Sequence, residues 1–310
     1  MQYVLSRHDG SIILYPGVGL WSDGSHHNLV LNFFGNYQRP DVVRDDPARL
    51  LAELGRQARV SNSDVVISSE ILSGHRDISE FVAAVRAAIG EECRVVVIAT
   101  VREHRERVAS LYNQRIKDAV IGETREPDVF LVDNPERFCY ASLLRRLMRT
   151  GFELVVLNYH PAEDFAARCL GLFGFTPGDV PLIPRRNVSL GRVALIATLA
   201  ANRAAESRED RALFDAALSR IVNRFANGDV LFGKTAIRAV RNLFIADRKF
   251  VQQQFGVDIP RPEKAVSTKP FVISEREFDA LNATMRELGD HGARTREHLR
   301  GFVTVAEPVS

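Results

Sequence analysis

Apolar and polar positions follow one another along the first part of the chain in a pattern that predicts strands, each followed by a helix. Near-continuous apolar runs, typical of buried strands, occupy residues 64–70, 95–101 and 152–160. Each run precedes a segment whose apolar residues recur at helical spacing. We therefore expect an α/β fold from about residue 40 to 175, with a parallel sheet covered by helices on both faces.

Local signals predict where helices begin. The segments 46–59 and 134–151 open with an Asp-Pro and an Asn-Pro pair, so Asp46 and Asn134 are the expected N-caps, with proline at the first helical position. Asp77 is followed three residues later by a glutamate. This spacing predicts a capping box that opens a helix ending near residue 88.

The pattern changes at Ser189, because the remaining apolar residues recur at helical spacing with no strand between them. Residues 259–270 have the proline and charge content of a surface linker, and the last ten residues are expected to fray. We expect one α/β domain over residues 1–258, whose part at 189–258 is a helical subdomain. A linker and a C-terminal helix would occupy residues 259–310.

Composition narrows the class of protein. The 310 residues are 45% hydrophobic and 26% charged, with a net charge of +2, so no global field favours nucleic acid or an anionic membrane. No apolar run approaches the roughly 20 residues of a transmembrane helix, and no signal-peptide pattern is seen. Cys93, Cys139 and Cys169 lie far apart without a CxxC pair, which favours a reducing compartment. We expect a cytoplasmic protein.

Polar residues end each expected strand, where ligands of open parallel sheets bind. These residues are Ser68, Ser69 and Glu70, then Arg102, and finally Asn158, Tyr159 and His160.

Arg102 and Ser110 form the first candidate site. A helix start favours an anion, and the arginine adds a charged fork suited to phosphate oxygens. Ser110 lies about 10 Å along the following helix at the normal rise per residue, so the Arg102 guanidinium and the Ser110 hydroxyl could bind the same phosphate. Alternatively, the arginine pairs with a nearby carboxylate, and the serine hydroxyl bonds back to a helix carbonyl.

The stretch "VREHRERVASLY" (101–112) resembles the 3′-phosphate-binding motif of sulfotransferases, with Arg102, Arg105 and Ser110 in the motif positions. Further segments resemble bacterial sulfotransferase-like proteins in the same order along the chain. They are "YPG" (15–17) with "HHNL" (26–29), "VVISSE" (65–70) and "RNVSLGRVALIATLAANR" (186–203).

This resemblance implies a three-layer parallel sheet of the P-loop type. It also implies 3′-phosphoadenosine 5′-phosphosulfate (PAPS) as co-substrate and sulfuryl transfer to a hydroxyl or amine of a small molecule or glycan, without a metal ion.

The resemblance also assigns roles to single residues. Glu70 is the first candidate for the general base that deprotonates the acceptor, although it could merely cap a helix or pair with His75 or Arg76. His27 is the alternative base, or else a surface or structural histidine. Adjacent His26 and His27 make a poor metal site, because no third ligand follows at helical spacing.

Arg186 is expected near the nucleotide, together with Asn187 and Ser189. Ser189 is also a good N-cap for the helix that follows it.

One departure from the family pattern is evident. The sequence contains no K-x-G-T-[ST] loop of the kind that holds the 5′-phosphosulfate, and "GVGLWSDG" (17–24) is expected to be an ordinary turn that opens no helix. "MQYVLSR" (1–7) resembles the helix that follows that loop, so we expect the reading frame to continue upstream of Met1.

The main alternative to a sulfotransferase is a noncatalytic nucleotide- or partner-binding protein. A kinase would need the same loop and an acidic Mg²⁺ ligand.

Overall fold

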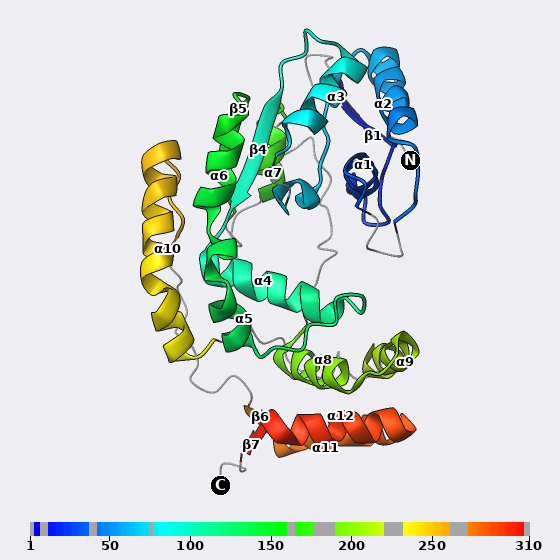
Figure 1. Cartoon of the computed structure of the whole chain (residues 1–310), viewed down its shortest axis with the longest axis vertical. Helices are drawn as coiled ribbons and strands as arrows, with labels where there is room; N and C mark the ends of the chain where they lie inside the picture. The colour runs from blue at the N-terminus through cyan, green and yellow to red at the C-terminus, as the bar shows by residue number, and fades with distance from the viewer. Residues whose placement is uncertain are drawn as a thin grey trace. The chain divides into compact units, whose positions relative to one another are not determined.

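The computed structural model describes residues 3–6, 12–36, 42–74, 77–159, 165–175, 190–219, 232–260 and 272–306. The chain divides into two compact units, the first from Met1–Val101 and Tyr140–Ile183, the second from Arg102–Cys139 and Pro184–Ser310. The fold is mixed α/β and mostly helical (Figure 1), which confirms the predicted class at this level.

The first unit begins with a three-stranded sheet. Strand β1 (Tyr3–Ser6) pairs antiparallel with β2 (Ile12–Tyr15), which pairs in parallel with β3 (Asp64–Val65). The expected helix over residues 1–7 is therefore wrong for residues 3–6, because ladder bonds to β2 outweigh any local helical preference. Strand β3 is shorter than the predicted run 64–70: beyond it, the Val66 N–H donates to the Leu14 carbonyl, and Glu70–Gly74 form the 3₁₀ helix η1.

Three α-helices complete the first part of this unit: α1 (His27–Phe33), α2 (Pro47–Ser61) and α3 (Ser79–Ile89). Asp46 is the N-cap of α2 and accepts from the Ala48 N–H at 3.0 Å, as predicted. The capping box expected at Asp77 is wrong, because the N-cap of α3 is Ile78. Asp77 instead accepts from the Ser79 N–H at 2.7 Å.

Helices α2 and α3 pack closely against each other. A Cβ added to Gly55 of α2 would lie 2.1 Å from the Ala88 carbonyl oxygen of α3, so only glycine permits this approach. The helices share an apolar core with α1. Its buried members are Val18, Leu29, Val30, Leu50, Leu54 and Phe81.

A parallel strand pair forms the other part of the first unit. Strands β4 (Val96–Val101) and β5 (Glu153–Asn158) pair in parallel with Val101 opposite Asn158, which confirms both predicted strands and their direction. Helices α6 (Tyr140–Arg149) and α7 (Phe165–Gly171) flank β5 in the chain. Within the described residues the strands form three separate sheets, and the single three-layer sheet stays a prediction.

The helix expected over residues 134–151 is interrupted. Pro135–Phe138 form the 3₁₀ helix η2, and Cys139 has an extended backbone with φ −81° and ψ 143° before α6 begins. Asn134 is the N-cap of η2 with Pro135 in its first turn, as predicted, but its side chain makes no capping bond. The break lets Phe138 become fully buried in the core of the second unit, which helical periodicity alone does not reveal.

The second unit is a helical assembly around α8. Its helices are α4 (His104–Lys117), α5 (Pro127–Asp133), α8 (Arg192–Ala204), α9 (Arg208–Ser219), α10 (Lys234–Phe255), α11 (Glu275–Arg286) and α12 (Gly289–Phe302). Nearly every side chain of α8 is buried, because two apolar clusters meet on it. One cluster joins α8 to α4, α5 and α10 and includes Tyr112, Phe130, Phe138, Leu195, Leu199 and Phe244. The other joins α8 to α9, α11 and α12.

The C-terminal region departs from the prediction in two ways. Short strands β6 (Val272–Ser274) and β7 (Thr304–Ala306) pair in parallel, although no strand was expected after Ser189. Helix α12 was not predicted because its sequence contains three glycines. A Cβ added to Gly292 would lie 1.7 Å from the Met285 carbonyl oxygen, so this glycine allows α12 to pack on α11.

Two general findings concern the described residues. No helix among them is long and apolar enough to cross a membrane. The three cysteines are free thiols.

Candidate functional site

The turn between β4 and α4 carries the first candidate residues. Strand β4 ends at Val101, whose carbonyl oxygen accepts from the Tyr159 N–H at 2.6 Å. Arg102 follows directly, as predicted. Glu103 is the N-cap of α4, and its carboxylate accepts from the Glu106 N–H at 3.0 Å. The backbone amides at this helix start are therefore partly satisfied by a carboxylate of the chain itself.

The two arginines of this turn each have an acidic neighbour. The Arg102 guanidinium lies 3.7 Å from the Glu106 carboxylate, and Nε of Arg105 lies 3.8 Å from the Glu103 carboxylate. Burial is the main cause that lowers the pKa of Arg105, and the nearby charge of Arg248 acts in the same direction. The contact of Arg102 with Glu106 is long and partly exposed, so it contributes less than about 1 kcal/mol, and an incoming phosphate can compete with Glu106 for Arg102.

Ser110 lies on α4 two turns from its start and is half-buried. Its hydroxyl has no hydrogen-bond partner within the described part of the chain, in contrast to Thr198 of α8, which donates to the Ala194 carbonyl at 2.7 Å. The alternative in which Ser110 bonds back to a helix carbonyl is therefore not what the structure contains.

In the first unit, His26 connects the loop after β2 with the segment after β3. Its Nε2–H donates to the Pro16 carbonyl at 3.0 Å, and Nδ1 accepts from the Ser68 N–H at 3.1 Å. Both ring nitrogens are occupied, which fixes the neutral tautomer and leaves no lone pair for a metal ion. Burial of the ring lowers the pKa of His26 to about 4.

His27, the alternative base, lies next to the serines that precede Glu70. Its Nδ1 is hydrogen-bonded to Oγ of Ser69 at 2.8 Å, and its ring meets Trp21 edge-on at 5.9 Å. Glu70 is the exposed first residue of η1, five residues beyond β3, so its predicted place at a strand end is wrong. Its carboxylate has no hydrogen-bond or ion-pair partner among the described residues.

Other predicted features of the first unit can be placed. The stretch 17–24 forms a turn in which the Gly24 N–H donates to the Trp21 carbonyl at 2.9 Å, although α1 does begin three residues after it.

Some predicted residues lie outside the part of the chain that the structure describes. They are Arg186, Asn187, Ser189, His160, His75 and Arg76. The N-cap of α8 is Gly191. No cluster of three metal-ligating side chains occurs in the described part of the chain.

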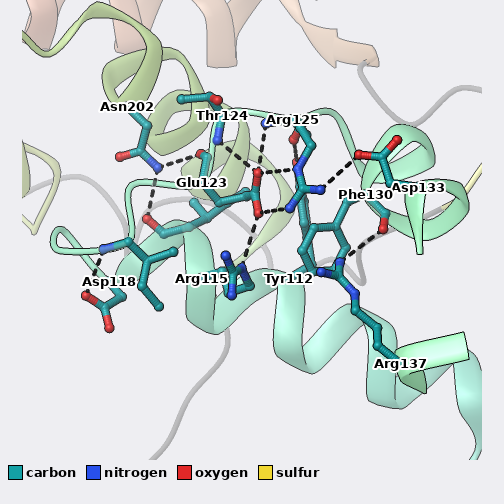
Figure 2. Close-up of polar contacts among 12 residues, drawn as sticks. Tyr112, Arg115, Asp118, Glu123, Thr124, Arg125, Phe130, Asp133, Arg137 and Asn202 are labelled. Carbon is teal, nitrogen blue, oxygen red and sulfur yellow. Dashed lines mark hydrogen bonds and ion pairs between the residues drawn. The ribbon is translucent and has the colours of Figure 1, made fainter. Parts of the chain in front are cut away.

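A polar network that the sequence did not predict surrounds Glu123 in the second unit (Figure 2). Its carboxylate accepts from Nε of Arg125 at 2.8 Å and from Nε of Arg115 at 3.2 Å. Arg125 also pairs with Asp133 at 2.9 Å. The guanidinium groups of Arg125 and Arg137 both lie over the ring of Phe130, at 5.2 and 4.1 Å.

This network is structural, since the donors around Glu123 leave it no role as a base. Burial alone would raise the pKa of Glu123, but the hydrogen bonds from Arg125 and Arg115 hold the pKa at about 2. Asn202 of α8 donates to the carbonyl oxygens of Ile116 and Glu123, at 3.1 and 2.9 Å. The network therefore stabilises the packing of the C-terminal end of α4 against α8.

The N-terminal end of α4 is held by a second unpredicted contact, between His104 and α10. Nε2 of His104 lies 2.7 Å from the Asp247 carboxylate, and both side chains are buried. A signal was present in the sequence: Val240, Phe244, Asp247 and Val251 recur at helical spacing, which places a carboxylate within an apolar face. Val240 and Phe244 of this face are buried.

Comparisons of the chain with known protein families, with curated proteins and with solved structures give no match.

Proposed function

We propose that the chain is a sulfotransferase-like protein that binds the 3′-phosphate of PAPS and transfers its sulfuryl group to a hydroxyl or amine acceptor on a small molecule or glycan. The observation that carries the proposal is the turn from β4 to α4. There, Arg102 follows a strand of a parallel pair, and Arg105 and Ser110 follow on the helix. Two cations and a hydroxyl are the groups that a phosphate dianion prefers.

The proposed phosphate contacts are made by side chains. Because Glu103 already caps α4, the helix amides contribute less than at an uncapped helix start. Arg102 would exchange its loose contact with Glu106 for a charge-assisted contact to the phosphate, with Arg105 beside it. Ser110, which has no partner within the described residues, would donate its hydroxyl. Arg186 is kept in the proposal as a further nucleotide ligand.

The proposed reaction assigns acceptor activation to Glu70 or His27. The acceptor oxygen or nitrogen attacks sulfur, and the bond from sulfur to the bridging oxygen of PAPS breaks. 3′-Phosphoadenosine 5′-phosphate leaves, and the acceptor proton passes to the base. Glu70 is the stronger candidate, since its exposed carboxylate has no partner in the described residues, whereas His27 is hydrogen-bonded to Ser69. The proposal needs no metal ion, and it carries with it the expectation of a P-loop-type sheet and a cytoplasmic location.

A second candidate function follows from the absence of a K-x-G-T-[ST] loop in the sequence. That loop would hold the bridging oxygen and the sulfuryl group as charge develops between them. Without it, we expect weak nucleotide binding and no transfer, so the chain would be a noncatalytic nucleotide- or partner-binding protein. An assay with radiolabelled PAPS and a mixture of hydroxyl and amine acceptors separates the two candidates.

Calorimetry tests the 3′-phosphate site that both candidates share. 3′-Phosphoadenosine 5′-phosphate should bind about 10- to 100-fold more tightly than AMP, as expected for a charge-assisted contact of roughly 1.5–3 kcal/mol. Arg102→Ala should remove most of this difference. Arg241→Ala, which removes an exposed charge on α10, is the matched control and should not. Equal affinity of the unmodified protein for the two nucleotides would overturn the assignment.

A further inference from the structure

His104, the first residue of α4, makes a polar contact and a ring-stacking contact with α10. Nε2 of His104 lies 2.7 Å from Oδ2 of Asp247, and the imidazole stacks on the ring of Phe244, with centroids 4.6 Å apart and an angle of 24°. His104 is fully buried, and Asp247 is 4% exposed. The two residues are 143 positions apart in the sequence, so the contact is purely tertiary.

The residue before His104 is fixed as well. Glu103 is 4% exposed and caps α4 through the Glu106 N–H, while its own carbonyl accepts from the Arg107 N–H at 2.9 Å. Two consecutive buried side chains thus lie between Arg102 and Arg105, whose side chains remain 31% and 18% exposed. The directions of the two arginines depend on the backbone that Glu103 and His104 hold.

Like charges oppose this arrangement. Burial lowers the pKa of Arg105, and the charge of Arg248, which follows Asp247 on α10, acts in the same direction, whereas the charge of Glu103 acts against it. The contact between His104 and Asp247 therefore holds together two helices whose neighbouring arginines repel each other. Removing one partner of a buried polar pair costs more free energy than removing an exposed one, so the contact is expected to be sensitive to substitution.

We infer that Asp247 is a positioning residue for the turn from Arg102 to Arg105: by holding His104, it fixes the backbone from which both arginines extend. The functional importance of this positioning rests on the proposed function, since these arginines are the proposed ligands of the 3′-phosphate. Asp247 itself would touch neither nucleotide nor acceptor.

Hydrogen exchange tests the positioning without any ligand. In Asp247→Asn, the amides of Glu106 and Arg107, which bond to Glu103, should exchange about ten-fold faster than in the unmodified protein. The Leu195 amide, which bonds to the Gly191 carbonyl in α8, should keep its rate. Asp258→Asn, at an exposed aspartate beyond α10, is the matched control. Unchanged exchange at the turn, or an equal acceleration at Leu195, would overturn the inference.

Calorimetry then connects the turn with the phosphate. Asp247→Asn should reduce the preference for 3′-phosphoadenosine 5′-phosphate over AMP by at least five-fold. A purely structural role would weaken the binding of both nucleotides equally and leave the preference unchanged. An unmodified protein without any preference would contradict the proposed function, whereas the exchange rates would still decide the positioning. A preference that Asp247→Asn leaves intact would contradict the inference alone.

Discussion

Nε2 of His26 lies 3.0 Å from the carbonyl oxygen of Pro16, within a site that leaves the imidazole no solvent exposure. The other ring nitrogen accepts from the Ser68 N–H. The ring therefore joins the loop after β2 to the segment that leads to Ser69 and Glu70. Because Nδ1 can accept from the Ser68 N–H only when it is unprotonated, the stability of this region depends on pH.

Acid should destabilise the first unit through His26. Burial lowers the pKa of His26 from 6.5 to about 4, so the unfolded chain takes up the proton first as the pH falls. The stabilisation is complete above pH 6.5 and is lost progressively as the pH falls toward 4. The loss amounts to about 2 kcal/mol at pH 5. Urea unfolding followed by the fluorescence of Trp21, the single tryptophan, measures it at pH 7 and pH 5.

The matched variant is His26→Gln, which cannot be protonated. It should be less stable at pH 7, but its unfolding free energy should change less between pH 7 and pH 5. An identical pH dependence in the variant would show that another group is responsible.

Loss of the Glu123 carboxylate should destabilise the second unit. Glu123→Gln leaves Arg115 and Arg125 without their shared anion, and we expect a loss of roughly 2–3 kcal/mol, less than for a fully buried pair because both arginines are about one-third exposed. Asp133→Asn is the control, since this half-exposed carboxylate should contribute less than about 1 kcal/mol. Chemical denaturation followed by circular dichroism measures both. Equal losses in the two variants would contradict the central role of Glu123.

Gly55→Ala should disrupt the packing of α2 on α3. The added Cβ would meet the Ala88 carbonyl oxygen at 2.1 Å, so the helices must separate, at a cost of about 1–3 kcal/mol. Gly171→Ala, at the end of α7, adds a Cβ with no atom within 4 Å and should change stability by less than about 0.5 kcal/mol. Thermal denaturation compares the pair. If Gly55→Ala melts like the unmodified protein, the close approach of the helices is wrong.

Substitution of the proposed base should affect turnover and spare nucleotide binding. In a form of the protein that transfers sulfate, Glu70→Gln should lower kcat by roughly 10²–10⁴ without changing nucleotide affinity, as expected for the loss of a general base. Glu91→Gln, at another exposed glutamate of the first unit, is the control. If only His27→Ala has this effect, the role of base belongs to His27.

The sequence determined the features that depend on neighbouring residues. The start of α2 at Asp46 and Pro47 follows from capping and from the fixed proline backbone, which act within one turn. Strands β4 and β5 follow from runs of β-branched residues too apolar to remain exposed, and their parallel pairing follows from the helical segments between them. The position of Arg102 after β4 and of Ser110 on α4 was readable for the same reason.

Only the tertiary structure decided the features that depend on partners distant in the chain. Strand β1 forms because β2 supplies its hydrogen bonds, and Cys139 interrupts a helix because Phe138 is buried in the core of the second unit. His104 and Asp247 lie 143 residues apart, and neither shows its partner in its own segment. Local patterns report the propensity of a segment and the face it buries. They do not report which distant polar group will satisfy a buried charge, since that depends on how the helices pack.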